Sequence, residues 1–165
     1  WMANACIEYI HNRGEENEYT EHYYYYVLEA KLYLHENIYV SIMTEFVENG
    51  DSEAQKQDCE RKAAKRLMAC LKARFPMLPI CISADSLYAN EGFFEMCQKY
   101  HWTYIVRYKK GSIPSIYEEY QSLRKQEQNH RKYQTEDLKC WYDHVNQIDY
   151  RGYRLNVLEY GDSAF

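Results

Sequence analysis

Apolar and aromatic positions divide the first half of the chain into two strand-like runs followed by a helical one. Residues 23–34 are rich in aromatic and branched side chains, and Glu36-Asn37 separates them from a second run, Ile38 to Phe46. Two such runs with a short connection predict an antiparallel hairpin. Residues 1–21 are mixed and polar, and Asn12-Arg13-Gly14 predicts a turn there.

The apolar spacing then changes from strand-like to helical. Ser52 followed three residues later by Gln55 is a capping-box signature, and apolar residues recur every three or four positions after it. The helix is expected to end near Phe75, because Pro76 and Pro79 disfavour helix at the positions that precede them. The basic residues between the apolar positions indicate a solvent-facing side.

The second half continues with alternating strand and helix patterns. Ile80 to Ala84 is a short apolar run, typical of a strand that is buried on both faces. Helical patterns follow over Glu91–Tyr100 and from about Ser115 to Lys125, and Trp102 to Tyr108 between them predicts a strand.

The last forty residues begin with a very polar segment. Residues 126–134 predict an exposed loop, and the segments 138–148 and 151–160 predict a hairpin that turns at 149–152. The complete order of strands and helices predicts an α/β fold with a mixed sheet, in which connections between parallel strands are right-handed.

Composition adds a few limits to this picture. Tyrosine is unusually frequent, at 19 of 165 residues, and favours half-buried sheet positions. The net charge of −5 argues against a uniformly basic nucleic-acid-binding surface, although a local basic patch remains compatible with it. No apolar stretch is long enough to span a membrane, so we expect a cytoplasmic protein. The six cysteines lack zinc-ligand spacing and are expected to be reduced thiols.

Asp85 is the main candidate for chemistry. It follows the most apolar strand of the chain, and ligand crevices in α/β sheets form at the carboxyl ends of strands. A carboxylate in that position can bind Mg²⁺, which prefers oxygen ligands. The alternative is that Asp85 only caps the turn or helix that follows it.

A small basic cluster follows the next predicted strand. Arg107, Lys109 and Lys110 could contact the phosphates of a bound DNA end. The alternative for these three residues is an ordinary solvated turn.

Several segments together resemble IS4-like insertion-sequence transposases of the DDE type. The resemblance is carried by residues 80–89 (ICISADSLYA), 22–32 (HYYYYVLEAKL), 44–49 (TEFVEN), 57–60 (QDCE) and 102–116 (WTYIVRYKKGSIPSI). It implies an RNase H-like domain in which two aspartates and one glutamate bind two Mg²⁺ or Mn²⁺ ions. Such enzymes act as oligomers that cut and join DNA at the ends of the element by two-metal chemistry.

The resemblance assigns the predicted elements to places in that domain. The hairpin at 23–46 would be its second and third strands, and Ile80 to Ala84 its fourth, so that Asp85 falls where the second carboxylate belongs. This divides the chain into a polar segment at 1–21, an RNase H-like core at 22–125, and a loop and β-hairpin insertion at 126–165.

Two expected parts of the domain have no counterpart in the chain. The first strand with its aspartate would lie before residue 1, and the helix with the final glutamate would lie after residue 165. Without a central first strand, the hairpin and the strand at 80–84 would keep unpaired edges that promote aggregation. One carboxylate cannot hold two metals, so we expect the chain alone to be inactive. The alternatives are a truncated or decayed gene product and a non-catalytic DNA-binding module.

Overall fold

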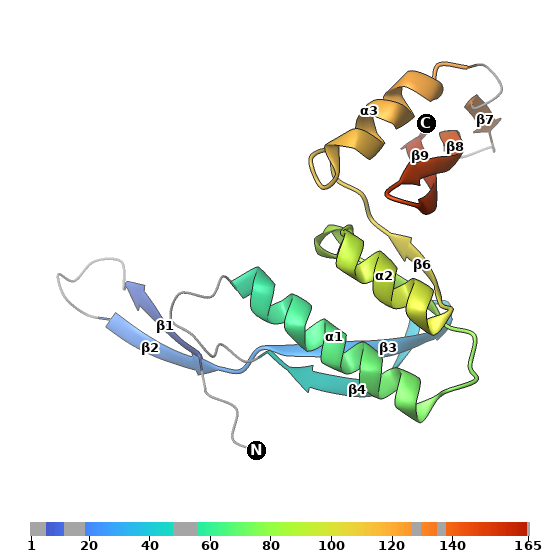
Figure 1. Cartoon of the computed structure of the whole chain (residues 1–165). Helices are drawn as coiled ribbons and strands as arrows, with labels where there is room; N and C mark the ends of the chain where they lie inside the picture. Colours follow the sequence, from blue (N-terminus) through green and yellow to red (C-terminus); the bar gives the residue numbers. More distant parts are fainter. Residues whose placement is uncertain (1–5, 12–18, 48–55, 127–129, 135–137, 165) are drawn as a thin grey trace. The chain divides into compact units, whose positions relative to one another are not determined.

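A computed structural model of the chain describes residues 6–11, 19–47, 56–126, 130–134 and 138–164. Within them the fold is mixed α/β, with three α-helices and four small sheets (Figure 1). The chain divides into two compact units, Trp1–Ile80 and Cys81–Phe165. The boundary after Ile80 differs from the boundaries that the family resemblance predicts, which lie after residues 21 and 125.

The first unit contains two antiparallel strand pairs. Strand β1 (Cys6–His11) pairs with β2 (Tyr19–Tyr24), and β3 (Val27–His35) pairs with β4 (Ile38–Phe46). The β4 strand has its predicted bounds. The run predicted as one strand at 23–34 is instead shared between β2 and β3, because each part pairs with a different partner. The polar start of the chain also forms strands, which its sequence does not predict, and the predicted turn at Asn12 lies outside the described residues.

Helix α1 (Lys56–Arg74) packs on one face of the β3–β4 hairpin (Figure 1). Ala63 is fully buried there, in a cluster with Val47, Tyr26 and Leu28. The helix ends before Pro76, as its sequence predicts, and the predicted capping box at 52–55 lies outside the described residues.

An ion pair also ties α1 to the hairpin. Arg66 donates from Nε to Glu45 Oε1 over 2.6 Å and from its terminal nitrogen to the carbonyl of Phe46 over 2.8 Å. The guanidinium therefore fixes the helix against the last residues of β4.

The second unit begins with a parallel pair joined by a helix. Strand β5 (Cys81–Ala84) pairs with β6 (Thr103–Val106), and α2 (Glu91–Tyr100) connects them with the bounds predicted from sequence. The side chain of Asn90 caps α2 by accepting a hydrogen bond from the Phe93 amide at 3.1 Å.

The expectation that the strand at 80–84 is buried on both faces is wrong. Cys81 and Ser83 are exposed, and Ile82 and Ala84 are only half-buried. Among the described residues β6 is the sole strand paired with β5. A two-stranded sheet leaves much of its surface in contact with solvent, so the apolar run is less covered than its composition indicates.

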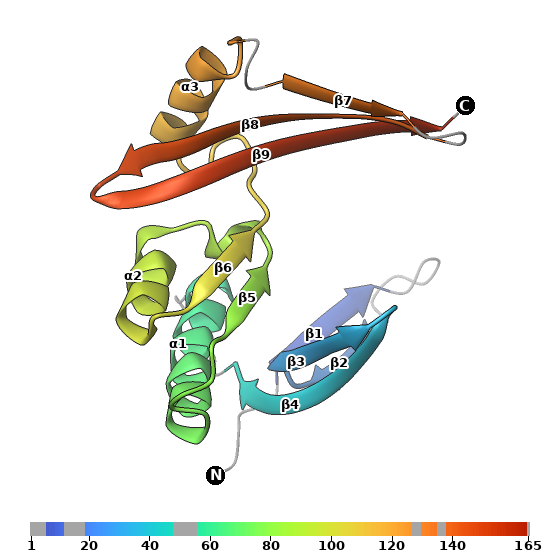
Figure 2. The same cartoon turned by 90° about the vertical axis from the view of Figure 1, so that its right-hand side faces the viewer.

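The rest of the second unit is a three-stranded antiparallel sheet with one helix on it (Figure 2). Helix α3 (Pro114–Leu123) contacts β8 (Leu138–Tyr150), which pairs with β7 (His130–Gln134) and with β9 (Tyr153–Ala164). The hairpin predicted at 138–160 is confirmed and is longer than expected.

The segment predicted as an exposed loop is partly a strand. Residues 130–134 form β7, while 127–129 lie outside the described residues. β7 is an edge strand, and polar or charged side chains are common on edges because they discourage association with other chains. The polarity that indicates a loop therefore also suits this strand.

Aromatic rings join the two parts of the second unit. Phe94 on α2 stacks on Tyr104 of β6 with ring centroids 5.2 Å apart, and it meets Tyr153 of β9 at 5.9 Å. An ion pair between Arg151 and Glu91 lies near these rings. No helix in the described part of the chain is long and apolar enough to cross a membrane.

Candidate functional site

Asp85 lies immediately after β5, at the start of a short 3₁₀ turn over Ser86–Tyr88. Its carboxylate is exposed and accepts a hydrogen bond from the Leu87 amide at 2.9 Å. The capping interaction that sequence reasoning gives as the alternative role is therefore present. Only Oδ1 takes part in it, so the second carboxylate oxygen remains available for another ligand.

Parallel pairing brings Arg107 to the same edge as Asp85. Ala84 and Val106 are paired residues, and the Arg107 amide donates to the Ala84 carbonyl at 3.0 Å. Asp85 and Arg107, which follow the two strands, therefore lie side by side at the carboxyl end of the strand pair. Such an edge is where α/β sheets bind ligands.

The two lysines of the predicted basic cluster lie in the turn after β6 and are exposed. Lys110 Nζ lies 5.4 Å from the ring centre of Tyr117, a cation–π distance, and this contact holds the lysine near α3. Gly111 has a φ of +106°, which allows the chain to turn there. Arg107, Lys109 and Lys110 therefore form a short exposed basic segment rather than a buried one.

The described residues do not by themselves supply a two-metal centre. No group of three or more histidine, cysteine, aspartate or glutamate side chains with metal-binding spacing occurs among them. Mg²⁺ usually takes one or two carboxylates and completes its shell with water or phosphate oxygens. Asp85 fits the role of one such ligand and cannot fill the whole set.

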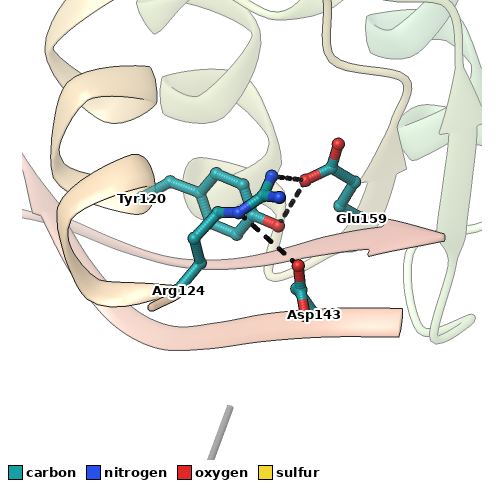
Figure 3. Close-up of polar contacts among 4 residues, drawn as sticks. All are labelled: Tyr120, Arg124, Asp143 and Glu159. Atoms are coloured by element: carbon teal, nitrogen blue, oxygen red, sulfur yellow. Dashed lines mark hydrogen bonds and ion pairs between the residues drawn. The ribbon is translucent and has the colours of Figure 1, made fainter. Parts of the chain in front are cut away.

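A second polar cluster, which sequence reasoning did not identify, lies between α3 and the β8–β9 hairpin (Figure 3). Asp143 and Glu159 are paired residues on neighbouring strands. Arg124, at the end of α3, forms ion pairs with both: its Nε is 3.5 Å from Asp143 Oδ2, and a terminal nitrogen contacts Glu159 Oε2. The Tyr120 hydroxyl donates to the same Glu159 oxygen at 2.8 Å.

Electrostatics explains why these four residues occur together. Two carboxylates opposite each other on adjacent strands repel, and Asp143 is only 4% exposed. The Arg124 guanidinium compensates both charges. Burial, and secondly the hydrogen bond to Glu159, raises the pKa of Tyr120, so its phenol stays protonated and acts as a donor. The cluster therefore secures α3 on the hairpin and offers no free nucleophile.

An open hollow of about 460 Å³ lies in the second unit, beside Phe94 and Tyr104. Among the described residues that line it, Arg154 is the only charged one, and Asp85 does not line it. Trp102, which also lines it, has a buried indole nitrogen without a hydrogen-bond partner among the described residues. The hollow offers ring surfaces and one cation, but no acid–base pair.

In comparisons with protein-family models, with curated proteins and with solved structures, no match to this chain was found.

Proposed function

We propose that this chain is part of an RNase H-like catalytic domain of a transposase, which cuts and joins DNA with the help of divalent metal. The order of its elements supports this: an antiparallel hairpin, a helix, and then two parallel strands connected by a helix. The observation that carries the proposal is the position of Asp85 at the carboxyl end of β5, with Arg107 beside it.

The proposed role of Asp85 is to provide one carboxylate oxygen to Mg²⁺ or Mn²⁺. Arg107, Lys109 and Lys110 would contact phosphates of the DNA, which brings the scissile strand to the same edge. Further metal ligands would have to come from residues outside the described part or from a longer protein. The chain alone is therefore proposed to bind DNA without cleaving it.

DNA binding tests the basic segment directly. Fluorescence anisotropy with a labelled duplex, measured at several salt concentrations, should show binding that weakens steeply with salt. Replacing Arg107, Lys109 and Lys110 with alanine removes up to three phosphate contacts, so the slope of log affinity against log salt should fall by roughly 2–3. The control is the pair Lys62→Ala and Lys65→Ala on the exposed side of α1. Equal losses in both variants would contradict a specific DNA-facing segment.

Metal binding tests Asp85. Electron paramagnetic resonance of Mn²⁺ added to the chain with duplex DNA should show less bound metal in Asp85→Asn, which keeps an oxygen for the Leu87 amide. Unchanged Mn²⁺ binding would leave Asp85 as a turn cap only. Plasmid nicking by the wild-type chain that is lost in Asp85→Asn would overturn the proposed inactivity.

The DNA that flanks the reading frame decides between an active parent and a decayed gene product. An in-frame strand ending in aspartate upstream, together with a helix bearing glutamate downstream, would support a transposase. Stop codons or frameshifts on both sides would instead indicate a relic.

A further inference from the structure

The hollow beside Phe94 and Tyr104 has the size and the lining of a small-molecule site. Its volume of about 460 Å³ falls within the usual range of ligand pockets, roughly 300–1,000 Å³, which aromatic side chains and a few polar groups commonly line. Tyr104 on β6 and Tyr153 on β9 both line it and are half-buried, so part of each side chain stays open to a ligand. The hollow therefore offers aromatic surface from two strands.

Phe94 holds these two tyrosines in place. It is 4% exposed, and its ring centre lies 5.2 Å from that of Tyr104 and 5.9 Å from that of Tyr153. The planes of the Phe94 and Tyr104 rings are nearly parallel, with 14° between them. Because this packing fixes the rings before a ligand arrives, ordering them costs little free energy on binding.

The charge on the wall of the hollow is positive. Arg154 lines it, and no acidic side chain is among the described residues that do. The Arg154 guanidinium donates a hydrogen bond to the neutral Gln147 side chain at 3.3 Å, and no carboxylate of the described residues pairs with it. A guanidinium can form two parallel hydrogen bonds with one carboxylate. Charge complementarity therefore favours a ligand that carries a carboxylate.

Two glutamates near the hollow limit the charge of that ligand. Burial raises the pKa of Tyr153, and after burial the nearby Glu95 and then Glu91 raise it further. Neither glutamate lines the hollow, and Glu91 forms an ion pair with Arg151. Because the negative field of Glu95 disfavours a second negative charge in the hollow, a monoanion fits it better than a nucleotide or another dianion.

Trp102 adds a buried hydrogen-bond donor to the same wall. The residue is 5% exposed, and its indole nitrogen has no acceptor among the described residues. Buried donors are almost always satisfied, so one without an acceptor marks a place where a polar atom from outside these residues belongs. Because the side chain also lines the hollow, its indole N–H is a local reporter of binding.

We propose that the hollow is a binding site for a small aromatic monocarboxylate. The ring of the ligand packs on Tyr104 and Tyr153, and its carboxylate pairs with Arg154. A ligand of about a dozen heavy atoms in such an open site should bind with a Kd of roughly 0.1–1 mM. This inference goes beyond the proposed function and does not rest on it, because neither Asp85 nor Arg107 lines the hollow.

Matched ligands test the site on the full chain, without a variant that could fail to fold. Hydrocinnamate has both the ring and the charge, hydrocinnamamide lacks the charge, and cyclohexanepropionate lacks the aromatic ring. Proton–nitrogen NMR separates the indole N–H signals of the 3 tryptophans, and comparison with Trp102→Phe identifies the signal of Trp102. Hydrocinnamate should shift this signal until it saturates, and each of the other two ligands should bind roughly fivefold more weakly.

Arg154→Gln tests the ion pair with the ligand. It should weaken the binding of hydrocinnamate by roughly fivefold and leave the binding of the neutral amide unchanged, because the amide has no charge to pair. The matched control is Lys99→Gln, which removes an exposed charge on α2 outside the hollow and should change the Kd by less than about twofold. Equal losses for the acid and the amide in Arg154→Gln would overturn the proposed ion pair.

Two further results would overturn the proposal as a whole. One is a Trp102 indole signal that stays in place when hydrocinnamate is added at roughly ten times the expected Kd. The other is tighter binding of thymidine monophosphate than of hydrocinnamate, because the hollow would then prefer a dianionic nucleotide to an aromatic monocarboxylate.

Discussion

Arg124 compensates two carboxylates that lie opposite each other on neighbouring strands. Its partner Glu159 is 35 residues away in the chain, and such a distance leaves no local sequence signal. Sequence reasoning could place Glu159 on a strand, but it could not predict that α3 would return a cation to it. Asp85 was easier to single out, because its position depends only on the apolar strand directly before it.

Replacing Arg124 with alanine should destabilise the protein by about 2 kcal/mol, because the buried Asp143 then loses its ion pair with Arg124. Urea unfolding of the full chain measures the loss. The neighbouring Lys125→Ala is the control, since Lys125 is exposed and its removal should change the free energy of unfolding by less than about 0.5 kcal/mol. Equal effects of the two changes would show that the cluster contributes nothing specific.

The Tyr120 phenol should make the stability of the protein depend on pH in the alkaline range. Its pKa is raised in the folded chain above the usual 10.0, so the unfolded chain loses this proton first as the pH increases. At pH 7, Tyr120→Phe should cost about 1 kcal/mol for the lost hydrogen bond to Glu159. Above pH 10 the free energy of unfolding of the wild type, relative to that of Tyr120→Phe, should fall by up to about 1.4 kcal/mol for each pH unit.

Urea unfolding of both proteins at pH 8, 10 and 11 provides the test. Burial also raises the pKa of Cys97 and of Tyr104, but both groups are present in the two proteins, so their effects cancel in the difference between the free energies of unfolding. A difference in the free energy of unfolding between the two proteins that stays constant with pH would mean that Tyr120 ionises equally in the folded and unfolded chains.

At the scale of elements, helices were predicted more accurately than strands. α2 has its predicted bounds because its apolar spacing and its cap at Asn90 are both local features. Strand bounds depend on partners instead, and the run at 23–34 divides between β2 and β3 for that reason. β7 escaped prediction because its stabilising contacts lie on β8, while its own residues are polar.

Alanine substitutions at two glycines should change the stability of the protein in opposite directions. A methyl group on Gly161 would lie 2.5 Å from the indole of Trp141, its paired residue on β8, so Gly161→Ala should cost about 1–3 kcal/mol. Gly92 lies within α2, and its added methyl meets only Asn90 Oδ1 at 3.5 Å. Gly92→Ala should therefore stabilise the protein by up to about 1 kcal/mol. Thermal unfolding of both variants checks the two signs, and a shared sign would contradict this account.

At the scale of the whole molecule, the sequence predicts the α/β class but not the division into units. The boundary at Ile80 lies inside the segment that the family resemblance treats as one core. Such a boundary follows from which contacts form across the chain, and local patterns do not reveal these contacts.

Limited proteolysis should cut first in the connection between the units. Met77 is 91% exposed and Leu78 is 52% exposed, and neither belongs to a helix or strand. Thermolysin cleaves before bulky apolar residues unless proline follows them, so Pro79 protects the bond before Leu78, and the first products should end at Pro76 and begin at Met77. Met77→Asp should remove that cut and leave the others. Early cleavage within α2 or β8 would show that those elements open more readily than the connection.

The pairing of strands has a consequence for how the protein forms during synthesis. Each described sheet joins strands that are close in the chain: β1 with β2, β3 with β4, β5 with β6, and β7 to β9 in order. Chains rich in such local pairings close only short loops and fold quickly. Each sheet can therefore assemble soon after its own residues leave the ribosome, before the rest of the chain has been made.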